Sequence, residues 1–161
     1  MEINMFKKTM MFCLFSFSLV FSLNVVAEPI KKGATLPSIT LNNQHGKAIK
    51  INTDIKTLLF SVEKAPSQII NTFLVKQEAN FLTKHKAYFV ADISGMPSLI
   101  SKMFAIPKMK KRPYDILLAK NKAQVDFIPH KKGFISVLKI ATGKVLSVRF
   151  INNTEQLAKV F

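Results

Sequence analysis

The spacing of apolar residues changes from one stretch of the chain to the next, most clearly between residues 57 and 94. Leu58–Val62 is a short, mostly apolar run, which is typical of a strand buried on both faces. The next apolar residues recur on one face of a helix: Ile70, Phe73, Leu74, Phe81 and Leu82. Ala87–Ile93 is a second buried run. The pattern predicts a strand, one long helix with Ser67 as its N-cap, and a parallel strand, joined by a right-handed crossover.

A hairpin is expected before this unit. Ile39 and Leu41 alternate with polar residues, as do Ile49 and Ile51, and a polar turn containing Gly46 lies between them. Alternation on both sides of such a turn indicates two antiparallel strands.

A shorter helix is expected after Pro97, which suits the first helical turn. Its apolar side is formed by Leu99, Ile100, Met103 and Phe104. We expect Pro107 to end this helix and a third parallel strand to follow at 115–119, after a basic connector.

The last elements are a hairpin of strands at 134–140 and 144–151 and a closing helix. Asn153, with Gln156 three residues later, resembles a capping box at the start of that helix. The chain contains neither internal repeats nor a low-complexity linker, so we expect one domain over residues 33–161.

The first 27 residues have the pattern of a secretory signal peptide. Lys7 and Lys8 precede the apolar run Met10–Val26, and Ala27 is a small residue suited to cleavage. We expect cleavage after Ala27, a loose leader at 28–32, and a periplasmic or secreted protein. The alternative is an uncleaved membrane anchor, because the run is nearly long enough to span a bilayer.

The cysteine content excludes disulfide chemistry for the exported chain. Cys13 is the single cysteine, and it lies inside the signal peptide. Cleavage after Ala27 would leave a protein without thiols in an oxidising compartment.

The charge points to partners rather than to a fold. The chain has 24 Lys and Arg against 9 Asp and Glu, a formal net charge of +15. Export argues against nucleic acid, so we expect an acidic protein, an anionic lipid or an acidic polysaccharide of the cell envelope. The alternative is that the lysines only maintain solubility.

The entry segment carries a family resemblance. Gly33, Leu36, Pro37, Ile39 and Leu41, followed by Gly46-Lys47, resemble the peroxiredoxin and TlpA-like branch of the thioredoxin superfamily. The resemblance implies an α/β thioredoxin-like fold, with a mixed sheet of about five strands and an N-terminal hairpin. The implied strand order is 115–119, 87–92, 58–62, 134–140 and 145–151, with the last two strands antiparallel to the first three.

The chain departs from this branch at its functional positions. Ala65-Pro66-Ser67-Gln68 stands where a thioredoxin has Cys-x-x-Cys, and the peroxiredoxin motif Pro-x-x-x-Thr-x-x-Cys has no counterpart. Lys131-Lys132-Gly133 occupies the place of the superfamily's cis-proline, with Pro129 and Pro113 as alternative candidates. We therefore expect no thiol-disulfide or peroxidase activity and no catalytic residue of that type.

The carboxyl ends of the parallel strands and the start of the fourth strand should share one edge of the sheet. That edge would gather a set that we name the basic rim: Lys64, Lys120, Lys122, His130, Lys131 and Lys132. It would surround two helix N-termini, at Ser67 and near Ser94, and helix N-termini attract anions. A second basic cluster comprises Lys102 and the stretch Lys108–Arg112.

Other candidate sites are weaker. Asp92 ends a strand at the edge where open α/β sheets bind ligands, but a role in capping the following turn is favoured. His45, His85 and His130 have no metal-ligand spacing, so no metal is expected. No glycine-rich phosphate loop or other cofactor motif is present.

These observations favour an exported, non-catalytic binding protein that holds an anionic partner at the basic rim. A hydrolase or transferase built around Ser67, Ser94 and Asp92 is the alternative from another class, although a serine nucleophile needs an adjacent base. A membrane-tethered envelope protein is the third interpretation, if the signal is not cleaved.

Overall fold

One seven-stranded sheet organises the chain in the computed structural model, which describes residues 28–51 and 53–161. The strands are β1 (Ile39–Asn43), β2 (Ala48–Ile51), β3 (Thr57–Ser61), β4 (Ala87–Asp92), β5 (Leu117–Ala119), β6 (Ile135–Ala141) and β7 (Lys144–Ile151). The α-helices are α1 (Lys64–Leu74), α2 (Phe81–Lys84), α3 (Ser98–Ile100), α4 (Ile106–Lys110) and α5 (Thr154–Ala158). A π-helical turn (Ser101–Ala105) joins α3 to α4, and a 3-10 helix (Lys122–Gln124) follows β5.

The strand order is β2-β1-β5-β4-β3-β6-β7. The strands β3, β4 and β5 are parallel and β6 is antiparallel to β3, so the expected order of the five strands is confirmed. The expected direction of the last strand is wrong: β7 is antiparallel to β6 and therefore runs in the same direction as β3. The expected signal peptide lies outside the described residues. No helix in the described part of the chain is long and apolar enough to cross a membrane.

The sheet is larger than expected because the N-terminal hairpin joins it. Strand β1 pairs antiparallel with β5, and the buried side chain of Gln44 fixes this junction. Its Nε2 donates to the carbonyl of Tyr114 at 2.8 Å, and its Oε1 accepts from the N–H of Ile116 at 2.8 Å. The amide side chain thus replaces a neighbouring strand at Ile116, which is why β5 begins at Leu117 and not at 115.

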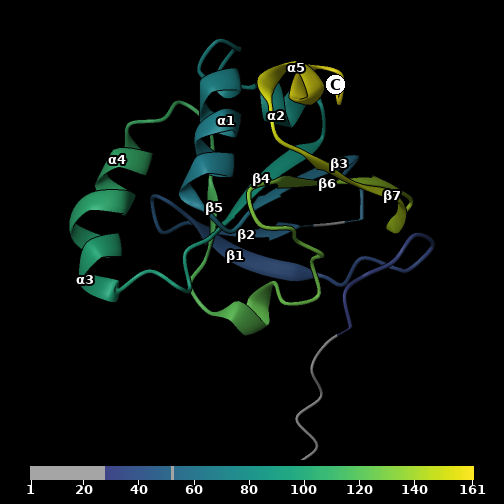
Figure 1. Cartoon of the computed structure of the whole chain (residues 1–161), viewed down its shortest axis with the longest axis horizontal. Coiled ribbons are helices and arrows are strands. Elements are labelled where there is room, and N and C mark those ends of the chain that lie inside the picture. The colour runs from purple at the N-terminus through teal and green to yellow at the C-terminus, as the bar shows by residue number, and fades with distance from the viewer. Residues whose placement is uncertain (1–27, 52) are drawn as a thin grey trace, which may run out of the picture.

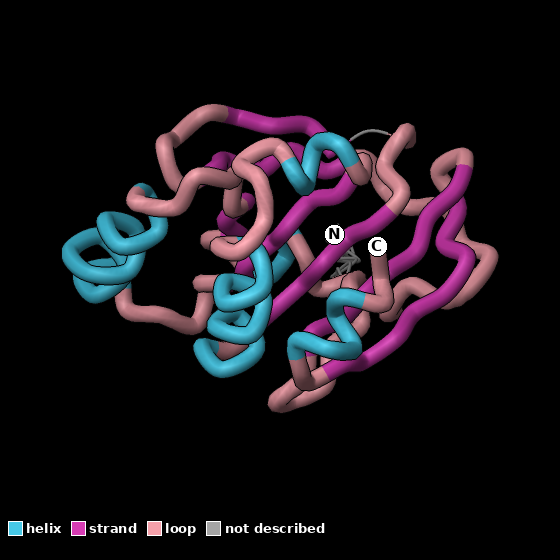
Figure 2. Tube along the Cα trace, turned by 90° about the horizontal axis from the view of Figure 1, so that it is seen from above, coloured by secondary structure: helices cyan, strands magenta, loops and turns pink. Residues whose placement is uncertain are grey.

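Both faces of the sheet are buried. Alternate residues of the central strands enter different apolar clusters: Leu58 and Phe60 lie on one side, and Leu59 lies on the other. Helices α1, α2 and α5 cover the face of Leu59, and segments around Leu36 and Val125 cover the other face. Figure 1 shows the long connections around the sheet, and Figure 2 shows α1 and α5 lying across one side of it.

The prediction of one long helix between β3 and β4 is wrong, since the structure has two helices there. α1 ends at Leu74, and the N–H groups of Lys76 and Gln77 bond to carbonyls only three residues back. These tighter turns close the helix and satisfy its last carbonyls. Phe81 begins α2 seven residues after Leu74, so the apolar period is the same with or without the break.

Pro107 does not end its helix, contrary to expectation. The helical segment runs from Ser98 to Lys110, and Pro107 lies at the start of α4. Proline cannot donate to the carbonyl four residues back and clashes with it. The π-helical turn directly before Pro107 widens the helix at that point, and such turns are a known way to absorb this misfit.

The start of the closing helix is confirmed in its main feature. The Oδ1 of Asn153 accepts from the N–H of Gln156 at 2.8 Å, as an N-cap does. The side chain of Gln156 bonds the N–H of Asn152 rather than that of Asn153, so the reciprocal bond is shifted by one residue.

A tyrosine hydroxyl connects α1 to the start of β5 and makes stability depend on pH. The Tyr114 hydroxyl donates to Oδ1 of Asn71 at 2.6 Å, and burial raises the pKa of Tyr114 above its ordinary value of 10.0. The contribution of the neutral hydroxyl is complete below the unfolded pKa and is lost as the pH rises through the folded pKa.

We predict that Tyr114→Phe lowers the free energy of unfolding by about 1 kcal/mol at neutral pH, because a buried hydrogen bond is lost. Above about pH 10 the difference should shrink, since only the parent chain loses stability by tyrosine ionisation at this site. Urea unfolding at several pH values measures both. A gap that widens with alkaline pH would contradict the assignment.

Candidate functional site

A cleft of about 570 Å³ lies at the carboxyl ends of the parallel strands, where open α/β sheets place ligands. It is lined by Phe60, Val62, Asp92, Ile93, Ser94, Gly95, Met96, Pro97, Lys122, Val125, Asp126 and His130. Most of these side chains are apolar, and the polar ones come from three separate loops.

The turn after β4 forms one wall of the cleft. Oδ1 of Asp92 accepts the N–H of Ser94 at 2.8 Å, and the N–H of Ile93 donates to the carbonyl of Ala119 at 2.9 Å. The first bond makes an Asx turn, as the capping interpretation of Asp92 predicts. The second ties this wall to the end of β5.

The loop after β5 forms the second wall. Oδ1 of Asn121 accepts the N–H of Ala123 at 3.0 Å, and Oε1 of Gln124 accepts the N–H groups of Lys120 and Asn121. This capping box holds the 3-10 helix in place. Lys122 therefore reaches the cleft from a fixed turn.

The segment before β6 forms the third wall. The N–H of Gly133 donates to Oε2 of Glu63 at 2.9 Å, which attaches this segment to the start of α1. Gly133 has a φ of +79°, a conformation that favours glycine. The rings of His130 and Phe60 pack edge to face, with 6.4 Å between their centroids. Nζ of Lys131 lies 4.5 Å from the centroid of the Phe134 ring.

The structure brings three residues of the predicted set into the cleft, while Ser67 does not line it and the other lysines lie on adjoining segments. Ser94, Lys122 and His130 line the cleft. Lys64 is the first residue of α1, and Lys131 and Lys132 precede the Gly133 contact with that helix. Lys120 directly follows β5.

The electrostatics of this edge are mixed. Within the described residues, none of the rim lysines forms an ion pair. However, Asp92 and Asp126 also line the cleft, and sequence reasoning did not include Asp126. The lining of the cleft therefore combines apolar side chains with Lys122, His130 and two carboxylates.

Ser67 is not the N-cap of α1, and this expectation is wrong. Glu63 is the N-cap, and Ser67 lies one turn inside the helix. The Ser67 hydroxyl donates to the Glu63 carbonyl at 2.9 Å and lies 2.8 Å from the hydroxyl of Ser61. A hydroxyl has one proton, so Ser61 must donate to Ser67.

One of the two helix N-termini also differs from expectation in position. The first lies at Glu63 rather than at Ser67, whereas the second lies at Pro97, three residues from Ser94 and close to the expected place. Pro66 misled the sequence reasoning, because proline is common in the first helical turn and Ser67 follows it.

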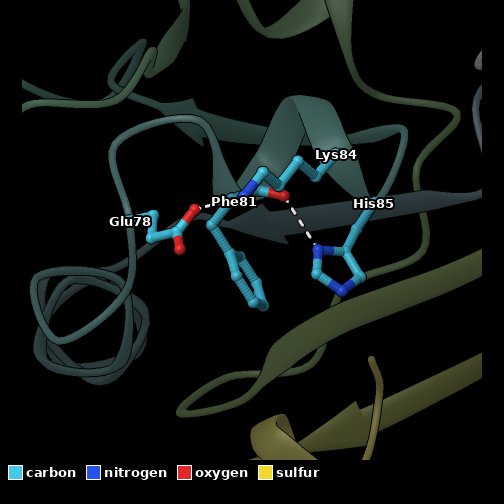
Figure 3. A network of polar contacts seen from close by, with 4 residues as sticks. All are labelled: Glu78, Phe81, Lys84 and His85. Atoms are coloured by element: carbon cyan, nitrogen blue, oxygen red, sulfur yellow. Dashed lines mark hydrogen bonds and ion pairs between the residues drawn. The ribbon is translucent and has the colours of Figure 1, made fainter.

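The three histidines lie in different surroundings. Figure 3 shows Nδ1 of His85 facing the carbonyl of Phe81, at 2.9 Å, beside the ion pair of Glu78 with Lys84. His45 is exposed on the β1–β2 turn, and His130 lines the cleft. The described residues contain no group of three or more His, Cys, Asp or Glu side chains that could hold a metal ion.

The position before β6 carries no proline. Lys132 and Gly133 occupy it, and all peptide bonds in the described part of the chain are trans, including those before Pro113 and Pro129. The cleft thus differs from the pattern of the resembling branch at both the cysteine and the proline positions.

Sequence reasoning missed the apolar lining of the cleft. Val62 is 39% exposed although it was assigned to a buried strand, because β3 ends at Ser61. Met96 and Val125 lie in loops, where no periodicity marks their direction.

Comparisons with known proteins agree on the fold. No family model matches the chain, and no curated protein matches it in sequence. Solved structures do match. One is described as a thiol:disulfide interchange protein DsbE from Chlorobium tepidum, with 16% identity over 81% of this chain and 94% of that chain, and a TM-score of 0.57.

Two further solved structures are similar. One is described as a thioredoxin from Neisseria meningitidis. It has 13% identity to this chain, the match covers 81% of this chain and 88% of that chain, and the TM-score is 0.53. The other is peroxidoxin BcpB from Mycobacterium tuberculosis. It has 14% identity to this chain, the match covers 81% of this chain and 93% of that chain, and the TM-score is 0.51. Together with the strand order, these matches show that the chain has a thioredoxin-like fold, here with a single cysteine, Cys13.

Proposed function

We propose that this protein is an exported, thiol-free binding protein that holds an acidic polypeptide at the cleft and its basic rim. The observation that carries the proposal is the cleft itself. It lies at the carboxyl ends of the parallel strands, next to the turn that leads into α1, and it combines apolar lining residues with Lys122 and with the other rim lysines on adjoining segments.

The lining supports a polypeptide over an acidic polysaccharide. The apolar side chains of Val62 and Met96 in the lining are partly exposed, and covering them with apolar groups of a ligand would be favourable, whereas a sugar chain offers few such groups. Acidic residues that flank the apolar groups of such a ligand would pair with the lysines of the basic rim. A charged border around an apolar centre is the usual arrangement of a protein interface.

The surroundings of Ser67 do not support the enzymatic alternative. Its hydroxyl proton is directed at the Glu63 carbonyl, and its second partner is Ser61, which is not a base. Asp92 is engaged by the N–H of Ser94. The proposal of export rests on the basic and apolar pattern of the first 27 residues.

The test is affinity capture from envelope extract with the chain from Glu28 as bait. Both apolar clusters consist of residues from Ile30 onward, so this bait contains the whole packed domain. We expect a discrete acidic protein to be captured at about physiological salt, where screening has already weakened contacts between exposed charges. Lys131→Glu/Lys132→Glu should abolish this capture.

Two matched variants separate a site from general charge. Lys47→Glu/Lys76→Glu makes the same change of charge at the other end of the molecule, since Lys76 follows the end of α1, and it should capture normally. Val62→Asn keeps the charge but places an amide in the apolar lining, and it should lose the partner. Equal loss in both lysine variants, or none in Val62→Asn, would contradict the proposal.

A structural role for Ser67 is predicted from its bond to Ser61. Ser67→Ala would leave the Ser61 hydroxyl buried without its partner and lower the free energy of unfolding by about 1–3 kcal/mol. Ser61→Ala/Ser67→Ala should be more stable than the single variant, since the orphaned hydroxyl is removed. Urea unfolding measures this, and capture should persist in both. A stable Ser67→Ala chain that loses binding would contradict a structural role.

A further inference from the structure

One helical segment presents its apolar residues to solvent. The side chains of Leu99, Ile100, Met103 and Phe104 are 65%, 44%, 59% and 63% exposed. They form the apolar side that the sequence predicted for this helix, and this side faces solvent instead of the core. Four large apolar side chains on consecutive turns form a continuous patch, and such patches mark interaction surfaces.

The opposite side of the same segment is the one that packs on the domain. Ile106 and Met109 contact the apolar cluster under α1, and Ser101 is 8% exposed. The helix is thus already anchored, and rotating it inward would break this packing. Figures 1 and 2 both place the segment at the outer end of the molecule, beyond α1.

Positive charges surround the patch. They are Lys102, Lys108, Lys110, Lys111 and Arg112. No acidic residue occurs in the sequence between Asp92 and Asp115, and within the described residues these cations form no ion pairs. The charge is therefore uncompensated next to exposed apolar side chains.

We propose that the segment of residues 98–112 docks the protein on an anionic lipid surface, with its apolar patch in the interface and its cations at the headgroups. Interfacial helices have this combination of apolar residues and lysines. This surface is separate from the cleft, so the inference goes beyond the proposed function. It also differs from the tethering expected of an uncleaved signal, since it uses the folded domain.

The charge argues against a second copy of the chain as the occupant. In a two-fold dimer the same patch would meet itself. The five cations listed above would then face five others with no carboxylate between them, which is repulsive. An anionic lipid surface pairs with all of them.

The absence of tryptophan from the chain allows a direct test. Phe104→Trp, in the chain from Glu28, places one reporter in the patch. With vesicles containing phosphatidylglycerol its emission should shift to the blue, and brominated lipid should quench it. Phe150→Trp, a reporter on β7 with 40% exposure at the native residue, should do neither. If vesicles leave the tryptophan emission of Phe104→Trp unchanged, the proposal is overturned.

Loss variants measured by vesicle sedimentation complete the test. Leu99→Ser/Phe104→Ser should weaken binding about tenfold or more, because apolar burial is lost. Lys108→Glu/Lys110→Glu should also weaken vesicle binding about tenfold or more, because each lysine contact with an anionic surface contributes about fivefold in affinity. Lys47→Glu/Lys76→Glu, with the same net charge, should be affected less. Equal weakening in both lysine variants would overturn the proposal.

Two other outcomes would also overturn it. A reporter shift that depends on protein concentration without vesicles would assign the patch to a second copy. Equal binding to neutral phosphatidylcholine vesicles would remove the role of the cations. Because Lys131→Glu/Lys132→Glu tests the cleft and Leu99→Ser/Phe104→Ser tests the patch, the two proposals fail independently.

Discussion

The structure depends on burying both faces of β3 and β4. Every residue of β3 is buried, and alternate positions serve opposite apolar clusters. Because a strand of this kind exposes no face to water, the rest of the chain must cover the sheet on both sides. Helices α1, α2 and α5 cover one face, and the entry segment with the loop after β5 covers the other. Parallel pairing of β3, β4 and β5 then brings their following loops to one edge, where the cleft forms.

We propose that the cleft at this edge of the thioredoxin-like fold serves for binding. The hydroxyl of Ser61 at the end of β3 lies against that of Ser67 in the first turns of α1, and this pair is used within the fold. The loop before β6 is held by Glu63 and Gly133 instead of by a proline. Neither replacement closes the cleft, because its lining comes mainly from Phe60, Val62 and the two loops after β4 and β5. The cleft therefore remains open, as the proposed binding function requires.

The sequence was sufficient for the order of the central strands, since the apolar runs around Leu58–Phe60 and Ala87–Ile93 fall on buried strands and the family resemblance implied their order. It was insufficient where side chains from distant segments decide the structure. The buried amide of Gln44 joins β1 to β5 across more than 70 residues, and no local pattern signals this. The predicted helix ends were wrong for local reasons. The break after Leu74 leaves the spacing of apolar residues unchanged, and the π-helical turn lets the helix continue through Pro107.

The candidate site was predictable in location but not in composition. Topology alone placed Lys122 and His130 at the edge, whereas the direction of Val62 and Asp126 depends on where a strand or turn stops. Similarly, apolar spacing could mark one side of the helix at 98–110 but could not show that this side faces outward. That depends on Ile106 and Met109, which have the better position against the core.

Photo-crosslinking in cells that export the protein tests the central claim most directly. A benzoylphenylalanine in place of Val62 lies in the cleft, and one in place of Phe150 lies on β7 and provides the control. The account predicts one discrete protein adduct from position 62 and none of that mass from position 150. The same adducts from both positions, or none from position 62 in a folded chain, would contradict the claim that this cleft is a binding site.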